Sequence, residues 1–173
     1  TTAPQPTQTP SSVTPPQPTQ APTSQPLPKK NSRCKVKGLI YKITASTASK
    51  KTVTVVKPVK KTAKTITIPA SVKIGGYSYQ VTQINAKAFR KNTRLRQVII
   101  GSKVTKIGRQ AFEGCRNLRK ITINTKVLKK IEPYAFRNVR KGAKIYVPKA
   151  RYKTYKKYLK AAKVTRDIKI VRK

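Results

Sequence analysis

Few side chains in this sequence could carry acid–base or metal chemistry. The carboxylates are Glu113, Glu132 and Asp167, which are scattered along the chain, and the sequence contains no histidine. General acid–base catalysis needs a positioned titratable group, and metal sites need several ligands close together. The composition therefore predicts a protein that is not an enzyme and that holds no metal and no cofactor.

The two cysteines, Cys34 and Cys115, are the remaining candidates for chemistry. Cys34 lies between Arg33 and Lys35, and cationic neighbours can lower the pKa of a thiol, so a reactive thiolate is one hypothesis. Without a histidine to act as a base, we expect no catalytic role for either cysteine. A disulfide between them is a second hypothesis for a secreted protein, and two cysteines alone do not decide it.

The charge of the chain is large and unevenly distributed. The 173 residues include 42 lysines and arginines against three acidic residues, which gives a formal net charge of +39. Residues 1–28 contain no charged residue and nine of the 13 prolines, among threonine, glutamine and serine. Such a segment cannot bury enough apolar surface to fold, so we predict a disordered linker or stalk over 1–28 and one domain over 29–173. No apolar run is long enough for a transmembrane helix.

The predicted domain contains an internal repeat of 23 to 24 residues. Three segments superimpose: VTQINAKAFRKNTRLRQVII at 81–100, VTKIGRQAFEGCRNLRKITI at 104–123 and LKKIEPYAFRNVRKGAKIYV at 128–147. The aligned apolar positions are Ile84, Ile107 and Ile131; Ala88, Ala111 and Ala135; Phe89, Phe112 and Phe136; Val98, Ile121 and Ile145; and Ile100, Ile123 and Val147. This period is typical of a solenoid in which each repeat forms one coil and stacking buries the apolar faces.

Each coil is expected to contain one strand and one short helical segment. Alternating apolar residues such as Val98 and Ile100 indicate the strand, and the stretch from Ala88 to Leu95 indicates a short helix or 3₁₀ turn on the opposite side. The aligned phenylalanines predict a continuous spine through the core.

The two ends of a solenoid need caps, because the last coils would otherwise expose apolar edges. Strand-like runs rich in β-branched residues lie at 38–44, 51–57 and 64–69. Gly75-Gly76 adds a hairpin signal, residues 148–163 have helical spacing, and 167–171 indicates a last strand. We therefore predict an α+β repeat solenoid with a β-rich N-terminal cap over 36–80, three repeats over 81–148, and a C-terminal helix and strand over 149–173.

The second repeat resembles the BspA-type leucine-rich repeat of bacterial surface proteins. That repeat reads hydrophobic–x–x–Ile–Gly–x–x–Ala–Phe–x–x–Cys–x–x–Leu–x–x–Ile–x–Ile, and the matching residues are Gly108, Ala111, Phe112, Cys115, Leu118, Ile121 and Ile123. The other repeats depart from it at Asn85 and Asn92, and at Glu132, Val139 and Gly142. The resemblance covers roughly residues 38–173, places Cys115 in the core and implies a leucine-rich-repeat domain. It also implies a secreted or cell-surface protein, and the lysine-rich form is similar to modules of Gram-positive anaerobes.

Stacked repeats also align basic residues. In the repeat register Lys120 aligns with Lys144 beside Gln97, and the predicted C-terminal helix carries further lysines between its apolar positions. Basic stripes of this kind suit a linear polyanion. The candidate polyanion-binding residues are Arg96, Arg116, Arg119, Lys120, Arg140, Lys144, Lys153, Lys156, Lys157 and Lys160.

The charge favours a non-catalytic attachment module that binds anionic polymers. The polymer could be the teichoic-acid-rich wall of a Gram-positive bacterium or an anionic host glycan. One alternative is a protein-recognition or spacer module appended to a secreted enzyme, with Ile99, Thr122 and Tyr146 facing outward from the strands. A second is a non-specific nucleic-acid binder, since phosphate neutralisation needs only positive charge, although no reading motif is visible. We expect a monomer that is secreted or bound at the cell surface.

Overall fold

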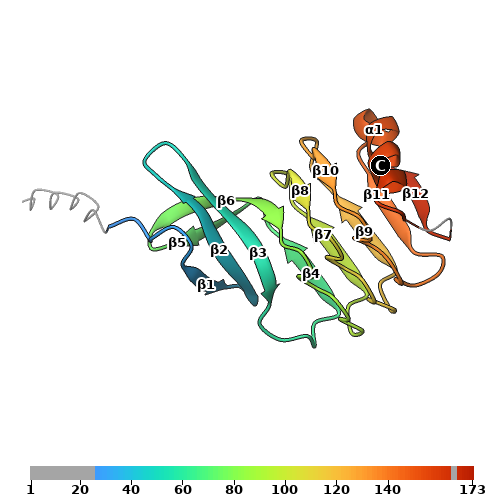
Figure 1. The fold of residues 1–173 in the computed structure, drawn as a ribbon, viewed down its shortest axis with the longest axis horizontal. Coiled ribbons are helices and arrows are strands. Elements are labelled where there is room, and N and C mark those ends of the chain that lie inside the picture. Colours follow the sequence, from blue (N-terminus) through green and yellow to red (C-terminus); the bar gives the residue numbers. More distant parts are fainter. Residues whose placement is uncertain (1–25, 165–166) are drawn as a thin grey trace, which may run out of the picture.

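The computed structural model of the protein describes residues 26–164 and 167–173. Most of the predicted linker over 1–28 therefore lies outside the described residues. The described chain forms two β-sheets, and its strands follow one another along the long axis of the molecule, with the helix α1 (Tyr152–Ala161) at the C-terminal end (Figure 1). This arrangement is the predicted repeat solenoid, built mostly of parallel strands with one α-helix among the described residues.

The larger sheet has seven strands, in the order β1-β2-β3-β6-β8-β10 with β5 also paired to β6. They are β1 (Arg33–Val36), β2 (Leu39–Ser46), β3 (Lys51–Pro58), β5 (Ser71–Ile74), β6 (Tyr77–Ile84), β8 (Lys106–Ile107) and β10 (Lys130–Ile131). Strands β1, β2 and β3 pair antiparallel, and from β3 onward the path through β6, β8 and β10 is parallel. The antiparallel end covers the start of the solenoid, and β5 and β6 form the predicted hairpin around Gly75-Gly76.

The smaller sheet has five parallel strands in the order β12-β11-β9-β7-β4. They are β4 (Thr65–Ile68), β7 (Gln97–Ile100), β9 (Lys120–Ile123), β11 (Lys144–Val147) and β12 (Lys169–Arg172). Neighbouring strands pair in register without a bulge. Strand β4 lies within the region 36–80 yet pairs with β7, so the parallel ladder begins before residue 81.

Each repeat contributes two strands, one to each sheet. In the second repeat these are β8 and β9, and in the third they are β10 and β11. The prediction of a single strand per coil was therefore wrong. Strands β8 and β10 have only two residues each, and the alternation that marks a strand cannot be recognised over so short a length.

Of the two predicted forms of the stretch from Ala88 to Leu95, a short helix or a 3₁₀ turn, the structure has turns closed by hydrogen bonds between residues three apart and no helix. In the first repeat Lys87 and Lys91 have positive φ values of 58° and 55°, and the equivalent residues of the next two repeats do as well. A right-handed helix cannot pass through left-handed residues, so the chain makes tight turns instead. The freed backbone N–H groups bond to the next coil: Phe89 donates to the carbonyl of Ala111 at 2.7 Å, and Phe112 donates to Ala135 at 2.8 Å.

The predicted phenylalanine spine is confirmed. The rings of Phe89 and Phe112 stack with centroids 5.0 Å apart, and those of Phe112 and Phe136 with centroids 5.3 Å apart. All three side chains are fully buried, as are the aligned isoleucines and valines of the strands. Because each coil places the same residue type over its neighbour, the core continues along the whole stack.

The C-terminal cap closes the last coil. A 3₁₀ turn, η1 (Lys149–Arg151), leads into α1, and the helix buries Tyr155 and Leu159 against the solenoid. The hydroxyl of Tyr155 accepts a hydrogen bond from the backbone of Leu128 at 3.1 Å and donates one to the carbonyl of Thr125 at 2.9 Å. Tyr155 therefore closes the final coil, because it provides both the apolar surface and the polar partner that the coil end needs.

Candidate polyanion-binding surface

The outer face of the five-stranded sheet carries a row of basic side chains. Strand pairing places Lys120 opposite Lys144 and Lys144 opposite Lys169, and Gln97 precedes them in the same row. In-register neighbours on adjacent strands are about 4.8 Å apart, so the row presents three cations at the spacing of the strands. All three lysines are exposed. The predicted alignment of Lys120 with Lys144 beside Gln97 is therefore present in the fold, and Lys169 extends it.

A second outward row runs beside the lysines, two residues further along each strand. It contains Thr67, Ile99, Thr122, Tyr146 and Val171. The four members from Ile99 onward are half-buried, and the ammonium group of Lys120 lies 5.3 Å from the centroid of the Tyr146 ring. The face thus combines a cationic row with a flatter row of apolar and hydroxyl groups.

Arg96 and Arg119 also align, one residue before their strands. The backbone N–H of Arg119 donates to the carbonyl of Arg96 at 2.8 Å, and that of Arg96 donates to the carbonyl of Lys64 at 2.7 Å. All three side chains are exposed. In the next coil the equivalent position is the buried Ala143. The row formed by Lys64, Arg96 and Arg119 therefore covers only the N-terminal half of the face.

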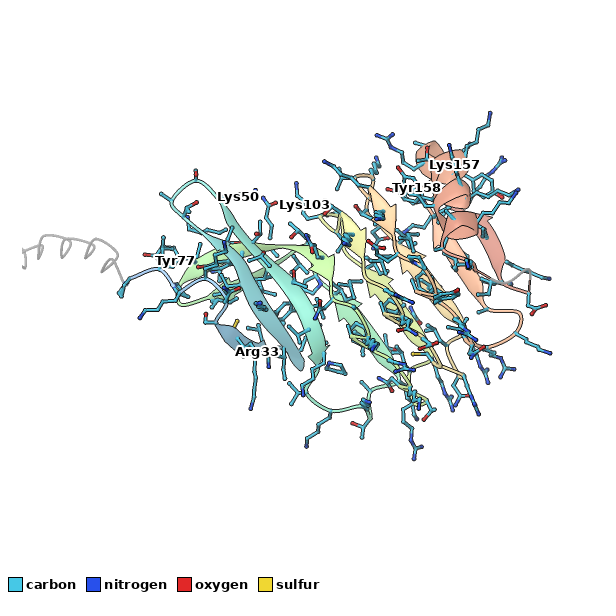
Figure 2. All side chains as sticks on the ribbon, in the orientation of Figure 1. Arg33, Lys50, Tyr77, Lys103, Lys157 and Tyr158 are labelled. Atoms are coloured by element: carbon cyan, nitrogen blue, oxygen red, sulfur yellow. The ribbon has the colours of Figure 1, made fainter. Side chains whose placement is uncertain are left out.

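The remaining candidates do not join this face as one site. Arg116 lines a pocket of about 350 Å³ formed by the turns, together with Arg90 and Lys91, whereas Arg140 is exposed but does not line that pocket. The helical lysines are all exposed on α1, including Lys157 (Figure 2). They are Lys153, Lys156, Lys157 and Lys160. The structure therefore places the ten predicted residues in three groups: the strand rows, the turns and the cap helix.

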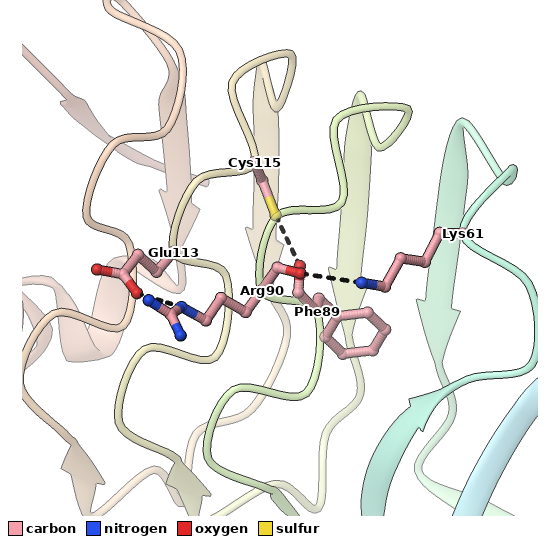
Figure 3. A network of polar contacts seen from close by, with 5 residues as sticks. All are labelled: Lys61, Phe89, Arg90, Glu113 and Cys115. Atoms are coloured by element: carbon pink, nitrogen blue, oxygen red, sulfur yellow. Dashed lines mark hydrogen bonds and ion pairs between the residues drawn. The ribbon is translucent and has the colours of Figure 1, made fainter.

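Two of the three acidic side chains, Glu113 and Glu132, are paired with neighbouring bases. Glu113 is largely buried and accepts a hydrogen bond at 2.6 Å from the guanidinium of Arg90, which occupies the equivalent position one coil earlier (Figure 3). Glu132 bridges Lys106 at 3.0 Å and Lys130 at 3.1 Å, and hydrogen bonds from these two ammonium groups lower its pKa. Within the described chain no other lysine or arginine has a carboxylate partner. The positive surface is therefore almost entirely uncompensated.

The two cysteines are free thiols in this structure. Cys115 is buried, as the repeat pattern predicted, and its Sγ lies 3.1 Å from the carbonyl oxygen of Phe89 (Figure 3). Burial raises the pKa of Cys115 to about 12. Burial also raises the pKa of Cys34, which lies half-buried in β1, so the hypothesis of a cation-activated thiolate at Cys34 was wrong. Desolvation of the thiolate is the cause of this increase.

Sequence reasoning missed two features of the basic surface. Lys169 follows Lys144 by 25 residues, and extending the register to the predicted strand at 167–171 would have found it. A cluster of cations around Tyr134 gave no signal, because its members come from different coils and from the end of the cap helix.

In the described residues no three acidic, cysteine or histidine side chains gather where they could hold a metal ion. None of the described helices has the length and apolar character of a membrane span.

Comparison with known proteins identifies the repeat. The family model of the BspA type leucine rich repeat region matches residues 60–171 with six copies, whereas no curated protein matches the chain. Among solved structures, a leucine rich cell surface protein from Faecalibacterium prausnitzii A2-165 is 27% identical with a TM-score of 0.54. That match covers 72% of this chain and 35% of the other.

Two further structures show the same architecture. The pneumococcal vaccine antigen PcpA is 25% identical with a TM-score of 0.57, over 71% of this chain and 34% of its own. The T. pallidum leucine rich repeat protein, at 18% identity and a TM-score of 0.50, covers 82% of this chain and 64% of its own and supports the fold alone. The chain spans about a third of the length of the Faecalibacterium and pneumococcal proteins. Since the family match extends over more than half of the sequence, this chain belongs to the BspA type leucine rich repeat family.

Proposed function

We propose that the protein is a bacterial cell-surface attachment module that binds an anionic polymer and catalyses no reaction. The candidate polymers are the teichoic-acid-rich wall of a Gram-positive bacterium and the anionic glycans of a host. Support for the surface location comes from the similar structure of a leucine rich cell surface protein, which is 27% identical to this chain where the two match. Support for the ligand class comes from the charge, with 42 basic residues against three acidic ones.

The single observation that carries the proposal is the row of Lys120, Lys144 and Lys169 across adjacent parallel strands. A linear polyanion lying along the solenoid axis would meet one cation per strand, about 4.8 Å apart. Each phosphate or sulfate that the row neutralises releases condensed counterions, so binding should weaken steeply as the salt concentration rises. A compact anion would gain little from a row, because it contacts only one or two of its members.

Neutralisation of phosphates by lysine also predicts binding to nucleic acids, even if a nucleic acid is not the biological ligand. Phosphate neutralisation by lysines is independent of base sequence, and such binding is expected from any protein of this charge. A nucleic-acid function would require a preference for one sequence or structure that persists in competition with heparin. Binding that heparin removes completely is electrostatic attachment of the kind proposed here.

The row of Ile99, Thr122, Tyr146 and Val171 favours a second candidate function, recognition of a protein partner. These half-buried side chains form a strip on the sheet face, and aromatic side chains are enriched where proteins bind one another. A protein bound through this strip would be held by apolar burial. Its affinity would therefore change little with salt, which separates the two candidates experimentally.

Sedimentation with purified bacterial walls tests the proposal, with one half of the preparation stripped of teichoic acid. We expect retention on intact walls that falls as sodium chloride is raised, and much weaker retention on stripped walls. An array of glycosaminoglycans and sialylated glycans at physiological salt provides the host arm. Equal retention on intact and stripped walls would exclude teichoic acid, and absence of binding to any anionic polymer on either arm would overturn the proposal. Salt-independent binding to a protein would favour the second candidate.

A further inference from the structure

Tyr134 lies where the last repeat meets the C-terminal cap. It occupies the turn position held by Lys87 in the first repeat and by Gln110 in the second, with φ 62°. Its backbone N–H donates to the carbonyl of Ala162, just beyond the end of α1, at 2.9 Å. This contact fixes the tyrosine against the end of the helix, so its ring stands at the junction between the coil and the cap.

Three cations surround the ring of Tyr134. The guanidinium carbon of Arg109 lies 6.0 Å from the ring centroid, that of Arg137 lies at 5.3 Å, and the ammonium nitrogen of Lys163 lies at 5.2 Å. They come from three segments: the second repeat, the third repeat and the residue pair that follows the helix. Among the described residues the rings of Tyr146 and Tyr152 each contact a single cation, Lys120 and Arg172 respectively, so three cations around one ring mark this junction.

The positive charge of this cluster is not neutralised. The carboxylates of Glu113 and Glu132 pair with other bases, and none of the three cations has an acidic partner within the described residues. Cation–π contact stabilises each cation against the ring but leaves its charge in place. Three like charges around one ring repel one another. An anion bound near them would attract each cation and so offset this repulsion.

The hydroxyl of Tyr134 is arranged to donate a hydrogen bond outward. The ammonium of Lys163 donates to the phenol oxygen at 3.1 Å, which leaves the phenol proton free, and that proton has no acceptor within the described residues. The hydrogen bond from Lys163 and the nearby positive charges lower the pKa of Tyr134, which reports a positive potential at the phenol oxygen. The guanidinium groups add planar pairs of donors that match an oxyanion.

We propose that Arg109, Tyr134, Arg137 and Lys163 form a discrete binding site for one tetrahedral oxyanion, a phosphate or sulfate group. The phenol and the three cations donate to its oxygens, and the two guanidinium groups hold it from different coils. This site goes beyond the attachment function proposed above. The lysine rows recognise many charges of a polymer together, whereas this cluster recognises the stereochemistry of a single group.

Titration of the whole chain with inorganic phosphate, and separately with sulfate, tests the site. The signal is the Nε–Hε resonances of the arginines in a 15N-labelled protein, at constant ionic strength set with sodium chloride. We expect saturable shifts at Arg109 and Arg137. The double variant Arg109→Gln with Arg137→Gln should lose about tenfold or more in affinity. Tyr134→Phe, which removes the outward donor together with the oxygen that accepts from Lys163, should lose about fivefold.

A charge-matched control separates the site from the general positive field. The variant Arg33→Gln with Arg94→Gln removes the same charge from two exposed arginines, neither of which has a side-chain hydrogen bond or ion pair to another described residue. Its phosphate affinity should stay within about twofold of that of the parent protein. Equal weakening in both double variants, or shifts that rise linearly without saturation, would overturn the site. Binding of sulfate but not phosphate would assign it to sulfated ligands, and the reverse would assign it to phosphorylated ones.

Retention on anionic polymers is measured for the same variants. If the parent protein is retained on anionic polymers but shows no saturable binding of phosphate or sulfate, only this inference is contradicted. If the parent protein binds phosphate but is not retained on any anionic polymer, only the attachment proposal is contradicted.

Discussion

Lys120 and Lys144 lie directly opposite each other on the adjacent parallel strands β9 and β11, with Lys169 continuing the row on β12. Like charges that face each other across a sheet repel and reduce stability. The same row contains the uncharged Thr65 and Gln97 on β4 and β7, so a neutral residue is compatible with the position. The fold could avoid this repulsion with neutral residues at these positions. That it keeps lysines there is consistent with a role of the row in binding.

Replacing Lys144 by glutamine should therefore stabilise the protein and weaken its binding. We expect Lys144→Gln to raise the free energy of unfolding by about 0.2–1 kcal/mol at low ionic strength and to lower the affinity for an anionic polymer. Urea denaturation at low and high salt measures the first effect, which salt should diminish. Lys57→Gln is the control, because Lys57 on β3 faces Ile40 rather than another lysine. A stability loss, or a gain that Lys57→Gln reproduces, would contradict the repulsion.

Asn92 should be replaceable by cysteine with a gain in stability. Its side chain is fully buried and both amide atoms lack a hydrogen-bond partner, at the position where the next repeat has Cys115. An unsatisfied buried amide costs about 1–3 kcal/mol, and a thiol is a small hydrophobe that avoids this cost. Asn92→Cys should thus increase the free energy of unfolding by about 1–2 kcal/mol in reducing buffer. Cys115→Asn should have the opposite effect, and a stability loss in Asn92→Cys would show that an internal water satisfies the amide.

Gly108 should tolerate no side chain. A methyl group there would lie 2.5 Å from the backbone nitrogen of Ala86 and 2.6 Å from the carbonyl carbon of Asn85, in the preceding coil. Because backbone cannot move aside cheaply, we expect Gly108→Ala to cost about 2–4 kcal/mol in thermal or urea unfolding. Gly142→Ala is the matched comparison: it has φ 75° but open space, and should cost only about 1 kcal/mol. Equal costs would mean that the coils can separate.

The two thiols should differ in reactivity. The thiolate is the reactive species, and burial raises the pKa of Cys115 to about 12, so almost none forms at pH 8 in the native state. With a chromogenic disulfide reagent we expect Cys34 to react in the folded protein and Cys115 to react only as the protein unfolds. The variant Cys34→Ser should abolish the native-state reaction. Two equally fast thiols, or an unchanged rate in that variant, would be incompatible with a buried Cys115.

Much of the fold follows from the sequence because each coil repeats the same core positions. The ladder through Phe89, Phe112 and Phe136 fixes the register, and that register also predicted the alignment of Lys120 with Lys144. Strands β8 and β10 were missed because two residues leave no detectable period. The sequence did not decide between a short helix and a 3₁₀ turn, because lysine, glutamine and tyrosine give little sign of the left-handed conformation that they adopt here.

The candidate surface was only partly predictable, for a different reason. Residues in the strands keep the repeat register, so their neighbours can be read from the sequence. The cluster around Tyr134 depends on how the cap helix docks, since Lys163 and Arg109 approach the ring from segments with no shared period. Docking is a tertiary effect set by the buried Tyr155 and Leu159, which the spacing alone does not locate relative to Tyr134.

The most direct test of the attachment proposal is the affinity for a linear polyanion as a function of salt, measured for two charge-reversed variants. One carries Lys120→Glu with Lys144→Glu in the row; the other carries Lys50→Glu with Lys57→Glu, two exposed lysines separated by most of the length of β3. The row predicts that the first variant binds on the order of tenfold more weakly than the second at equal net charge, with a shallower salt dependence. Equal affinities and equal slopes for the two variants would show that net charge alone determines binding and would contradict the row.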